Sequence, residues 1–87
     1  MFEWDSNKNQ KNIEKHGVSF ETEIEIFNDK LMHETDKNVN GEIRTVAIGK
    51  IEDIVVTVVY TYRNEKHRII SARRASKIER MVYHGKK

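Results

Sequence analysis

The sequence predicts a single α+β domain, and three observations lead to this fold class. Residues 54–62 are almost all β-branched or aromatic, as in a strand that is covered by other elements. Segments 19–29 and 75–82 instead repeat apolar residues at helical spacing. The 87 residues fit one domain, 1–87, because neither proline nor a linker marks an internal boundary.

The N-terminal segment predicts a short strand followed by a helix. Residues 2–4 can form the strand, with both aromatic side chains on one face. Asp5 or Ser6 can cap a helix over residues 7–16. Gly17 suits the end of that helix, because glycine adopts the left-handed conformation at the lowest cost.

A second helix should follow directly after the first. Ser19 is a suitable N-cap, and acidic residues come in the favourable first turn. Phe20, Ile24 and Phe27 recur at i, i+4 and i+7, which places them on one helical face. We expect this helix to end near residues 28–29.

The middle of the chain predicts strands that are joined by short turns. Such strands pair antiparallel. Residues 36–41 are rich in Asp, Asn and Gly and predict a turn. The expected strands are residues 31–36, 43–50, 54–62 and 66–72.

The C-terminal segment predicts a last helix. Ser76 and Glu79 have the spacing of a capping box, and Ala75, Ile78 and Val82 form an apolar stripe. The fold expected from all these elements is a small antiparallel sheet of about four strands, packed against two N-terminal helices and a C-terminal helix.

Charge is divided unevenly along the chain. Residues 1–62 hold seven Lys/Arg and twelve Asp/Glu, a net charge of −5, whereas residues 63–87 hold nine and two, a net charge of +7. Such a basic segment is either a solvated tail or a surface for a polyanion or an acidic partner. The absence of cysteine excludes disulfides, and with no signal peptide or long apolar run we expect a cytoplasmic protein without membrane contact.

Several well-known catalytic motifs are missing from the sequence. It contains no glycine-rich phosphate loop, HExxH, CxxC or GxSxG. The four histidines show no spacing typical of metal ligands. We therefore expect neither a metal nor another cofactor.

Basic residues gather in and around the last predicted strand. Strand alternation places Arg68 toward a face that also carries apolar residues, which suggests partial burial and an anionic partner. That partner could be a structural carboxylate, Glu42 or Glu79, or a bound phosphate. Alternation predicts Lys66, Arg68 and Ile70 on one face, and His67, Ile69 and Ser71 on the other.

Arginines from neighbouring strands could meet on one face of the sheet. Arg63 has the same parity as Thr57 and Thr61, and Arg44 lies on the adjacent expected strand. Guanidinium groups bind phosphate oxygens bidentately and can stabilise charge in phosphodiester cleavage, for which RNA supplies its own 2′-hydroxyl nucleophile. The residues that could transfer a proton are Lys15, His16, Glu42, His67 and Tyr83.

The sequence also resembles a known protein family along nearly its whole length. The matching blocks are Phe2–Asp5, Lys15–Phe20, Phe27–Asp29, Gly41–Arg44, Ile48–Gly49, Thr61–Arg63 and Arg68–Ala75, followed by Glu79 and Tyr83. In order and content these blocks resemble the BrnT toxin family. The chain departs from the family pattern at Lys30, where proline is usual, and at His84, where an acidic residue often follows the tyrosine.

The resemblance implies a RelE-like fold and a toxin of a type II toxin–antitoxin system. Such toxins are ribonucleases that inhibit translation and are neutralised by a protein antitoxin, here of the BrnA type. The expected assembly is a hetero-oligomer with that antitoxin, and contact with operator DNA comes only through the complex. The family blocks flag Lys15, His16, Arg63, Arg68, Arg73 and Arg74.

Three functional interpretations remain open at this point. The first is a metal-independent endoribonuclease; the second is a non-catalytic basic module that binds an antitoxin or nucleic acid. For the first, we expect catalytic roles for Lys15, His16, Arg63, His67 and Arg68, and RNA-binding roles for Arg44, Lys66, Arg73, Arg74 and Lys77. A third possibility is an obligate structural partner whose exposed helix surface is covered by another protein.

Overall fold

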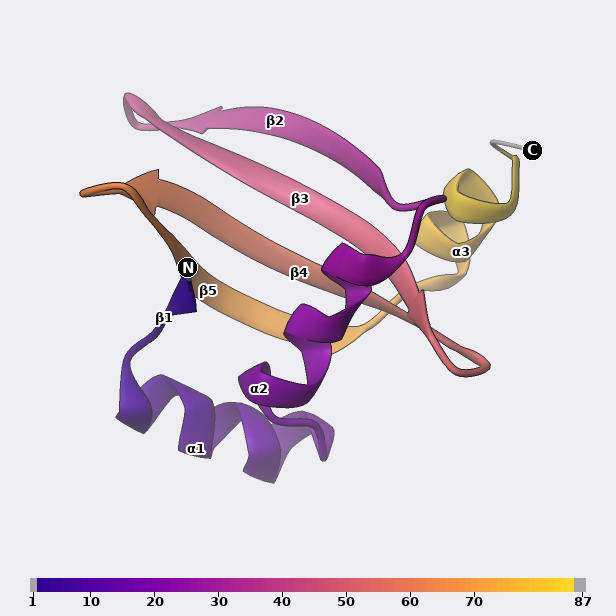
Figure 1. The fold of residues 1–87 in the computed structure, drawn as a ribbon, viewed down its shortest axis with the longest axis horizontal. Coiled ribbons are helices and arrows are strands. Elements are labelled where there is room, and N and C mark those ends of the chain that lie inside the picture. The colour runs from indigo at the N-terminus through magenta and orange to yellow at the C-terminus, as the bar shows by residue number, and fades with distance from the viewer. Residues whose placement is uncertain (1, 86–87) are drawn as a thin grey trace.

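The computed structural model describes residues 2–85 and confirms the α+β class (Figure 1). One sheet has the strand order β1-β5-β4-β3-β2, so it holds five strands rather than about four. The short strand predicted at residues 2–4 is β1, which joins the sheet by pairing parallel with β5, whereas the other neighbours are antiparallel. The elements are β1 (Phe2–Glu3), α1 (Ser6–His16), α2 (Phe20–Glu23), the 3₁₀ helix η1 (Ile24–Asn28), β2 (His33–Val39), β3 (Glu42–Ile51), β4 (Ile54–Arg63), β5 (Lys66–Arg74) and α3 (Lys77–Gly85).

The caps of the N-terminal helices are those that the sequence predicts. The Asp5 carboxylate accepts hydrogen bonds from the backbone N–H groups at the start of α1, and Gly17 ends that helix with a φ of 75°. The Ser19 hydroxyl accepts from the N–H of Thr22. The expected single second helix is instead a short α2 that tightens into η1 after Glu23.

The helices α1, α2 and η1 pack on one face of the sheet, which we call the covered face. Here η1 approaches β3 so closely that a Cβ on Gly49 would lie 2.7 Å from the Cβ of Ile26, which explains the glycine. The buried residues of this core are Phe20, Ile26, Ala47, Val56, Val58, Tyr60, Ile69 and Ala72.

Strand β2 is longer than the sequence predicts. The turn expected over residues 36–41 contracts to Asn40 and Gly41, whose φ angles are 53° and 87°. An Asn-Gly pair favours a two-residue hairpin, so the polar residues before it continue the strand. Lys37 thereby pairs with Arg44 across the β2–β3 ladder.

An irregularity in the β4–β5 ladder changes which residues share a face. Val59 pairs with Ser71, but the next residue, Tyr60, pairs with Ile69, so one residue of β5 is extra. Ser71 therefore has the parity of Arg68 rather than that of His67. The prediction that Ser71 shares the face of His67 is wrong for this reason.

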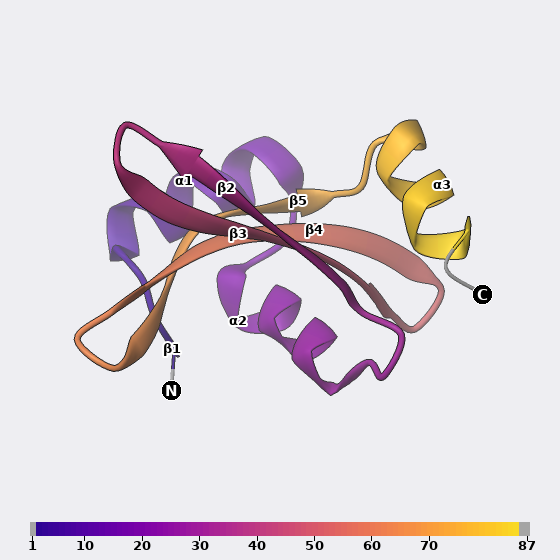
Figure 2. The same cartoon turned by 90° about the horizontal axis from the view of Figure 1, so that it is seen from above.

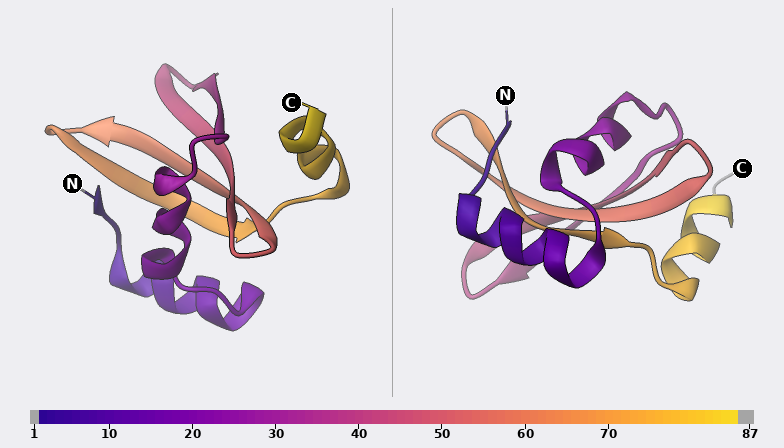
Figure 3. Two further views of the ribbon diagram at one scale, coloured as in Figure 1. Left: turned by 45° about the vertical axis from the view of Figure 1, so that its right-hand side comes forward. Right: turned by 90° about the horizontal axis from the view of Figure 1, so that it is seen from below.

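Helix α3 packs on the opposite face of the sheet, which we call the open face, and it covers only one end. Tyr83 and Ala75 pack against Ile48 and Val55 and are buried there. Strand alternation points Ile48 and Val55 to the face opposite the main core. Figures 2 and 3 show α3 set apart from α1 and α2, beyond the end of β5. The apolar stripe predicted for this helix is only partly buried. Ala75 is buried, but Ile78 is 74% exposed and Val82 is 40% exposed.

Candidate functional site

Basic side chains gather on the open face, toward the β4–β5 hairpin. Arg68 pairs with Thr61, and Lys66 with Arg63, across the β4–β5 ladder. Their parity is that of Thr57 and Thr61, so they share the open face. The register also places Arg44 and Lys37 on this face. We call the set the basic face: Lys37, Arg44, Arg63, Lys66 and Arg68.

Two carboxylates lie among these cations. Glu42 accepts from Nε of Arg44 and from Nη2 of Arg63, each at 3.0 Å. These hydrogen bonds lower the pKa of Glu42, so it is ionised at neutral pH. Arg68 donates from Nη1 to Glu3 at 3.1 Å. Of the alternatives for Arg68, the structure has the ion pair with a structural carboxylate, but the partner is Glu3 and not Glu42 or Glu79, because β1 places Glu3 beside it.

The ion pairs of the basic face leave its arginines accessible. The side chains of Arg63, Arg44 and Arg68 are 54%, 36% and 35% exposed. Each donates through one nitrogen to its carboxylate, and a guanidinium has five N–H donors. Exposed pairs of this kind contribute only about 0–1 kcal/mol, so a phosphate can compete for them. Five cations and two carboxylates leave a net charge of +3.

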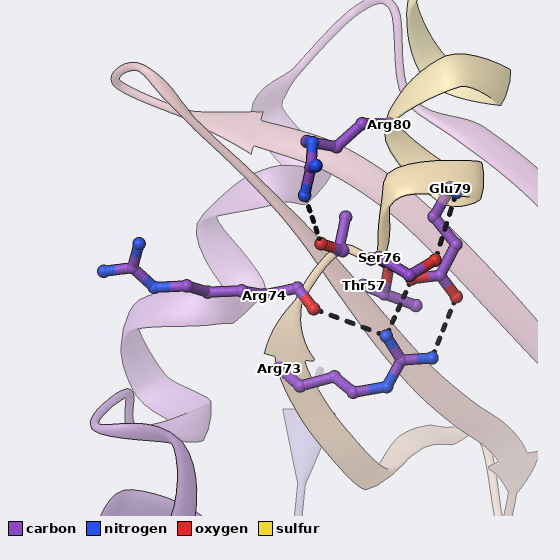
Figure 4. A network of polar contacts seen from close by, with 7 residues as sticks. Thr57, Arg73, Arg74, Ser76, Glu79 and Arg80 are labelled. Carbon is purple, nitrogen blue, oxygen red and sulfur yellow. Dashed lines mark hydrogen bonds and ion pairs between the residues drawn. The ribbon is translucent and has the colours of Figure 1, made fainter.

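Arg73 lies on the same face but is held differently (Figure 4). Its Nη1 and Nη2 donate to the two carboxylate oxygens of Glu79 at 2.7 and 2.8 Å. Glu79 also accepts from the Thr57 hydroxyl and the Ser76 N–H, and Ser76 caps the Glu79 N–H in return. The predicted capping box is thus confirmed, and it includes Arg73. The hydrogen bonds from Arg73 lower the pKa of Glu79 to about 2 despite its burial.

Four other predicted residues lie away from the basic face. Gly17, directly after Lys15 and His16, lines a hollow of about 490 Å³ together with Ile54 and Arg74. This hollow is at the start of β4, whereas Arg63 ends that strand. A ten-residue strand spans roughly 30 Å. The structure therefore does not bring Lys15, His16 or Arg74 together with Arg63. Lys77 begins α3, at the other end of the open face.

His67 lies on the covered face, among aromatic rings. Its ring centroid is 5.2 Å from that of Phe2, 5.1 Å from that of Tyr60 and 5.2 Å from that of Tyr62. Its Nδ1 is buried and has no hydrogen-bond partner among the described residues. The sheet thus separates His67 from the arginines with which it was predicted to act.

Of the predicted proton carriers, Glu42 is the one that lies within the basic face. Tyr83 instead donates from its hydroxyl to Asp29 at 2.6 Å, and burial together with this carboxylate raises the pKa of Tyr83 to about 12. Such a phenol stays protonated near neutral pH. Tyr83 therefore serves to attach α3 to the end of η1.

Sequence reasoning missed two residues of the site. Glu3 is half-buried beside Arg68, and strand alternation with Phe2 could have placed it opposite the aromatic core. Lys37 was assigned to a turn, and the Asn-Gly pair that follows it was the signal for a longer strand. Residues 2–85 contain no group of three or more His, Asp or Glu side chains arranged to hold a metal.

Comparison with known proteins identifies a family. The model of the family described as "Ribonuclease toxin, BrnT, of type II toxin-antitoxin system" matches residues 4–79. This range includes every residue of the basic face. A search of curated proteins gave no match. Within residues 2–85, no helix is both long and apolar enough to cross a membrane.

Proposed function

The chain belongs to the BrnT family of ribonuclease toxins of type II toxin–antitoxin systems, and from this premise we propose that it cleaves RNA on the basic face without a metal ion. The observation that carries the proposal is the register of the sheet, which gathers Arg44, Arg63 and Arg68 on a face that α3 covers at one end only. Their unused N–H donors match phosphate oxygens in charge and geometry.

The reaction needs few protein groups, because RNA carries its nucleophile. The 2′-hydroxyl oxygen attacks the adjacent phosphorus, the bond from phosphorus to the 5′-oxygen breaks, and a 2′,3′-cyclic phosphate and a 5′-hydroxyl result. Arg63 and Arg68 stabilise the charge that develops on the phosphate oxygens. Glu42, ionised and beside Arg63, accepts the proton of the 2′-hydroxyl. Lys66 donates a proton to the departing 5′-oxygen.

Cleavage of RNA by this chain would stop translation, and a protein antitoxin would restore it. A type II system implies a protein antitoxin. We assign it to the BrnA type, and we infer that operator DNA is bound only through the toxin–antitoxin complex. Both parts of this proposal are supported by the likeness of the sequence to the family, and no contact within this chain is used for them.

A second function is favoured by one feature of the same face. Every arginine among Arg44, Arg63, Arg68 and Arg73 has a carboxylate partner inside the chain. If phosphate does not displace these partners, the face binds an acidic protein or nucleic acid and cuts nothing. Salt should then weaken binding through counterion release, while the RNA stays intact.

Purified protein incubated with RNA in excess EDTA tests the proposed reaction. We expect cleavage that leaves 2′,3′-cyclic phosphate ends, and no cleavage at a nucleotide whose 2′-hydroxyl is replaced by hydrogen. Cleavage that requires added Mg²⁺, or that proceeds at the 2′-deoxy position, contradicts the mechanism. Binding of intact RNA without any cleavage supports the second function instead.

A further inference from the structure

Helix α3 exposes apolar side chains that its own sheet does not use. Ile78 is 74% exposed, Met81 64% and Val82 40%. Their i, i+3 and i+4 spacing makes them one stripe, which we call the α3 stripe. The helix is held to the sheet by Tyr83 and Glu79 on its other side. The α3 stripe is therefore not needed to dock the helix.

The α3 stripe borders the uncovered part of the open face. Arg80 is on the side of α3 that lines a small hollow with Asp53 and Ile54, at the β3–β4 turn. Glu79 contacts Thr57, farther along β4 toward the basic face. A helix turns 100° per residue, so going around the helix axis from Arg80 one meets Glu79 and then Val82. Val82 therefore lies on the side of α3 opposite the β3–β4 turn. The Val82 edge of the stripe thus lies on the side of α3 that is turned toward the middle of the sheet, whereas Met81 points away from the sheet.

The charges around the stripe indicate which class of partner fits it. Lys77 and Arg80 are exposed and form no ion pair among residues 2–85, while Glu79 is bound to Arg73. Arg80 donates to the carbonyl oxygen of Ala75, a neutral acceptor that does not offset its positive charge. A second copy of the chain would set these cations against one another. RNA would leave the apolar side chains without a partner.

From these contacts we infer that the antitoxin docks on the α3 stripe through a segment that carries both apolar and acidic residues, and that it continues from there across the basic face. The inference rests on the proposed function in one respect, because covering the basic face silences the toxin only if RNA binds there. Its docking part rests on exposure and charge alone. The apolar side chains of that segment would pack against Ile78 and Met81, and its carboxylates would pair with Lys77 and Arg80.

Co-expression with the protein encoded by the adjacent reading frame tests this inference. Ile78→Asp and Met81→Asp place a charge on exposed positions, so the chain should fold and cleave RNA as before. The complex should weaken by more than 100-fold, and co-expression should no longer rescue growth. Gln10→Asp adds the same charge at an exposed position of α1 and should change neither property.

The outcomes separate this inference from the proposed function. If Ile78→Asp abolishes the complex while the wild-type chain cuts no RNA, docking on α3 stands and the ribonuclease proposal fails. If the variants bind the adjacent-frame protein as tightly as Gln10→Asp does, the inference is overturned, whatever the ribonuclease activity. The inference is also overturned if the wild-type chain forms no complex with that protein. A dimer of the wild-type chain that Ile78→Asp converts to monomer would overturn it as well.

Discussion

The two ends of the open face show how differently the same residue type can be used. Toward the β4–β5 hairpin, Arg63 and Arg44 share the single carboxylate of Glu42, and both stay accessible to solvent. Toward α3, Arg73 is bound through two nitrogens to a carboxylate that also receives Thr57 and Ser76. Pairing geometry, more than residue type or position in the sequence, therefore separates an arginine that can take a ligand from one that holds the fold.

The largest effect should come from removing arginines at the hairpin end. We expect Arg63→Ala and Arg68→Ala each to lower the RNA cleavage rate by about 100-fold, because a donor to the developing phosphate charge is lost. Stability should change by less than about 1 kcal/mol, since the ion pairs are exposed. Initial rates and urea unfolding of the same preparations measure both quantities.

Lys11→Ala is the matched control for these variants. Lys11 lies exposed on α1 and has the same charge, so its loss should leave the rate within a factor of two. Equal losses in Lys11→Ala and Arg63→Ala would show that only the total charge matters, and the distinction between the two ends would disappear.

At the α3 end, breaking an arginine–carboxylate pair should lower the free energy of unfolding rather than the cleavage rate. We expect Glu79→Gln to lower the free energy of unfolding by about 2–3 kcal/mol, because it leaves Arg73 without its charged partner and weakens the capping box. In the wild type, the pKa of Glu79 is lowered to about 2, so this contribution is complete above about pH 4.5 and is lost as pH falls through 2.

Urea unfolding at pH 7 measures this loss, and Glu65→Gln in the exposed β4–β5 turn is its control. If Glu79→Gln left stability unchanged but abolished RNA cleavage, Arg73 and Glu79 would belong to the catalytic machinery. The comparison between the two ends would then be wrong.

A smaller effect on the free energy of unfolding should come from Glu23, the last residue of α2, which lies on the covered face of the sheet. This carboxyl is fully buried and has no hydrogen-bond partner within residues 2–85, and burial raises its pKa to about 7 even though Arg73 and Arg74 oppose the shift. The folded state therefore binds this proton more tightly than the unfolded state does. Stability from the neutral carboxyl is complete below about pH 4.5 and is lost as pH rises through 7.

Glu23→Gln should thus stabilise the protein at pH 8, by about 1–3 kcal/mol, and have little effect at pH 4. Urea unfolding at both pH values measures the difference, with Glu14→Gln on the exposed side of α1 as control. A gain of equal size at both pH values would show that ionisation of Glu23 is not the cause.

Local signals in the sequence predicted most of the fold. Asp5, Gly17, Ser19 and Ser76 cap the helices as expected, because capping depends on a few neighbouring residues. The strand at 54–62 was equally clear. The parallel pairing of β1 and the extra residue of β5 were not predicted, because both depend on contacts between segments far apart in the sequence.

The candidate site was predictable in part for the same reason. Parity within β5 correctly set Arg68 apart from His67, and this separation already argued against a joint role for them. The partner of Arg68 was missed, because Glu3 is 65 residues away and reaches it only through the β1–β5 pairing. Lys15 and His16 were included on family likeness, and nothing in their spacing indicated which end of the sheet they approach.

Mapping the RNA-binding surface tests the central claim most directly. A short RNA with 2′-O-methyl groups cannot be cleaved, so it can be titrated into isotope-labelled protein while amide and arginine Nε resonances are followed. We predict the largest shifts in residues 42–46 and 61–68, including Nε of Arg63 and Arg68, and small shifts in residues 13–17. Shifts concentrated in residues 13–17 and at Arg74, with the basic face unchanged, would contradict the account.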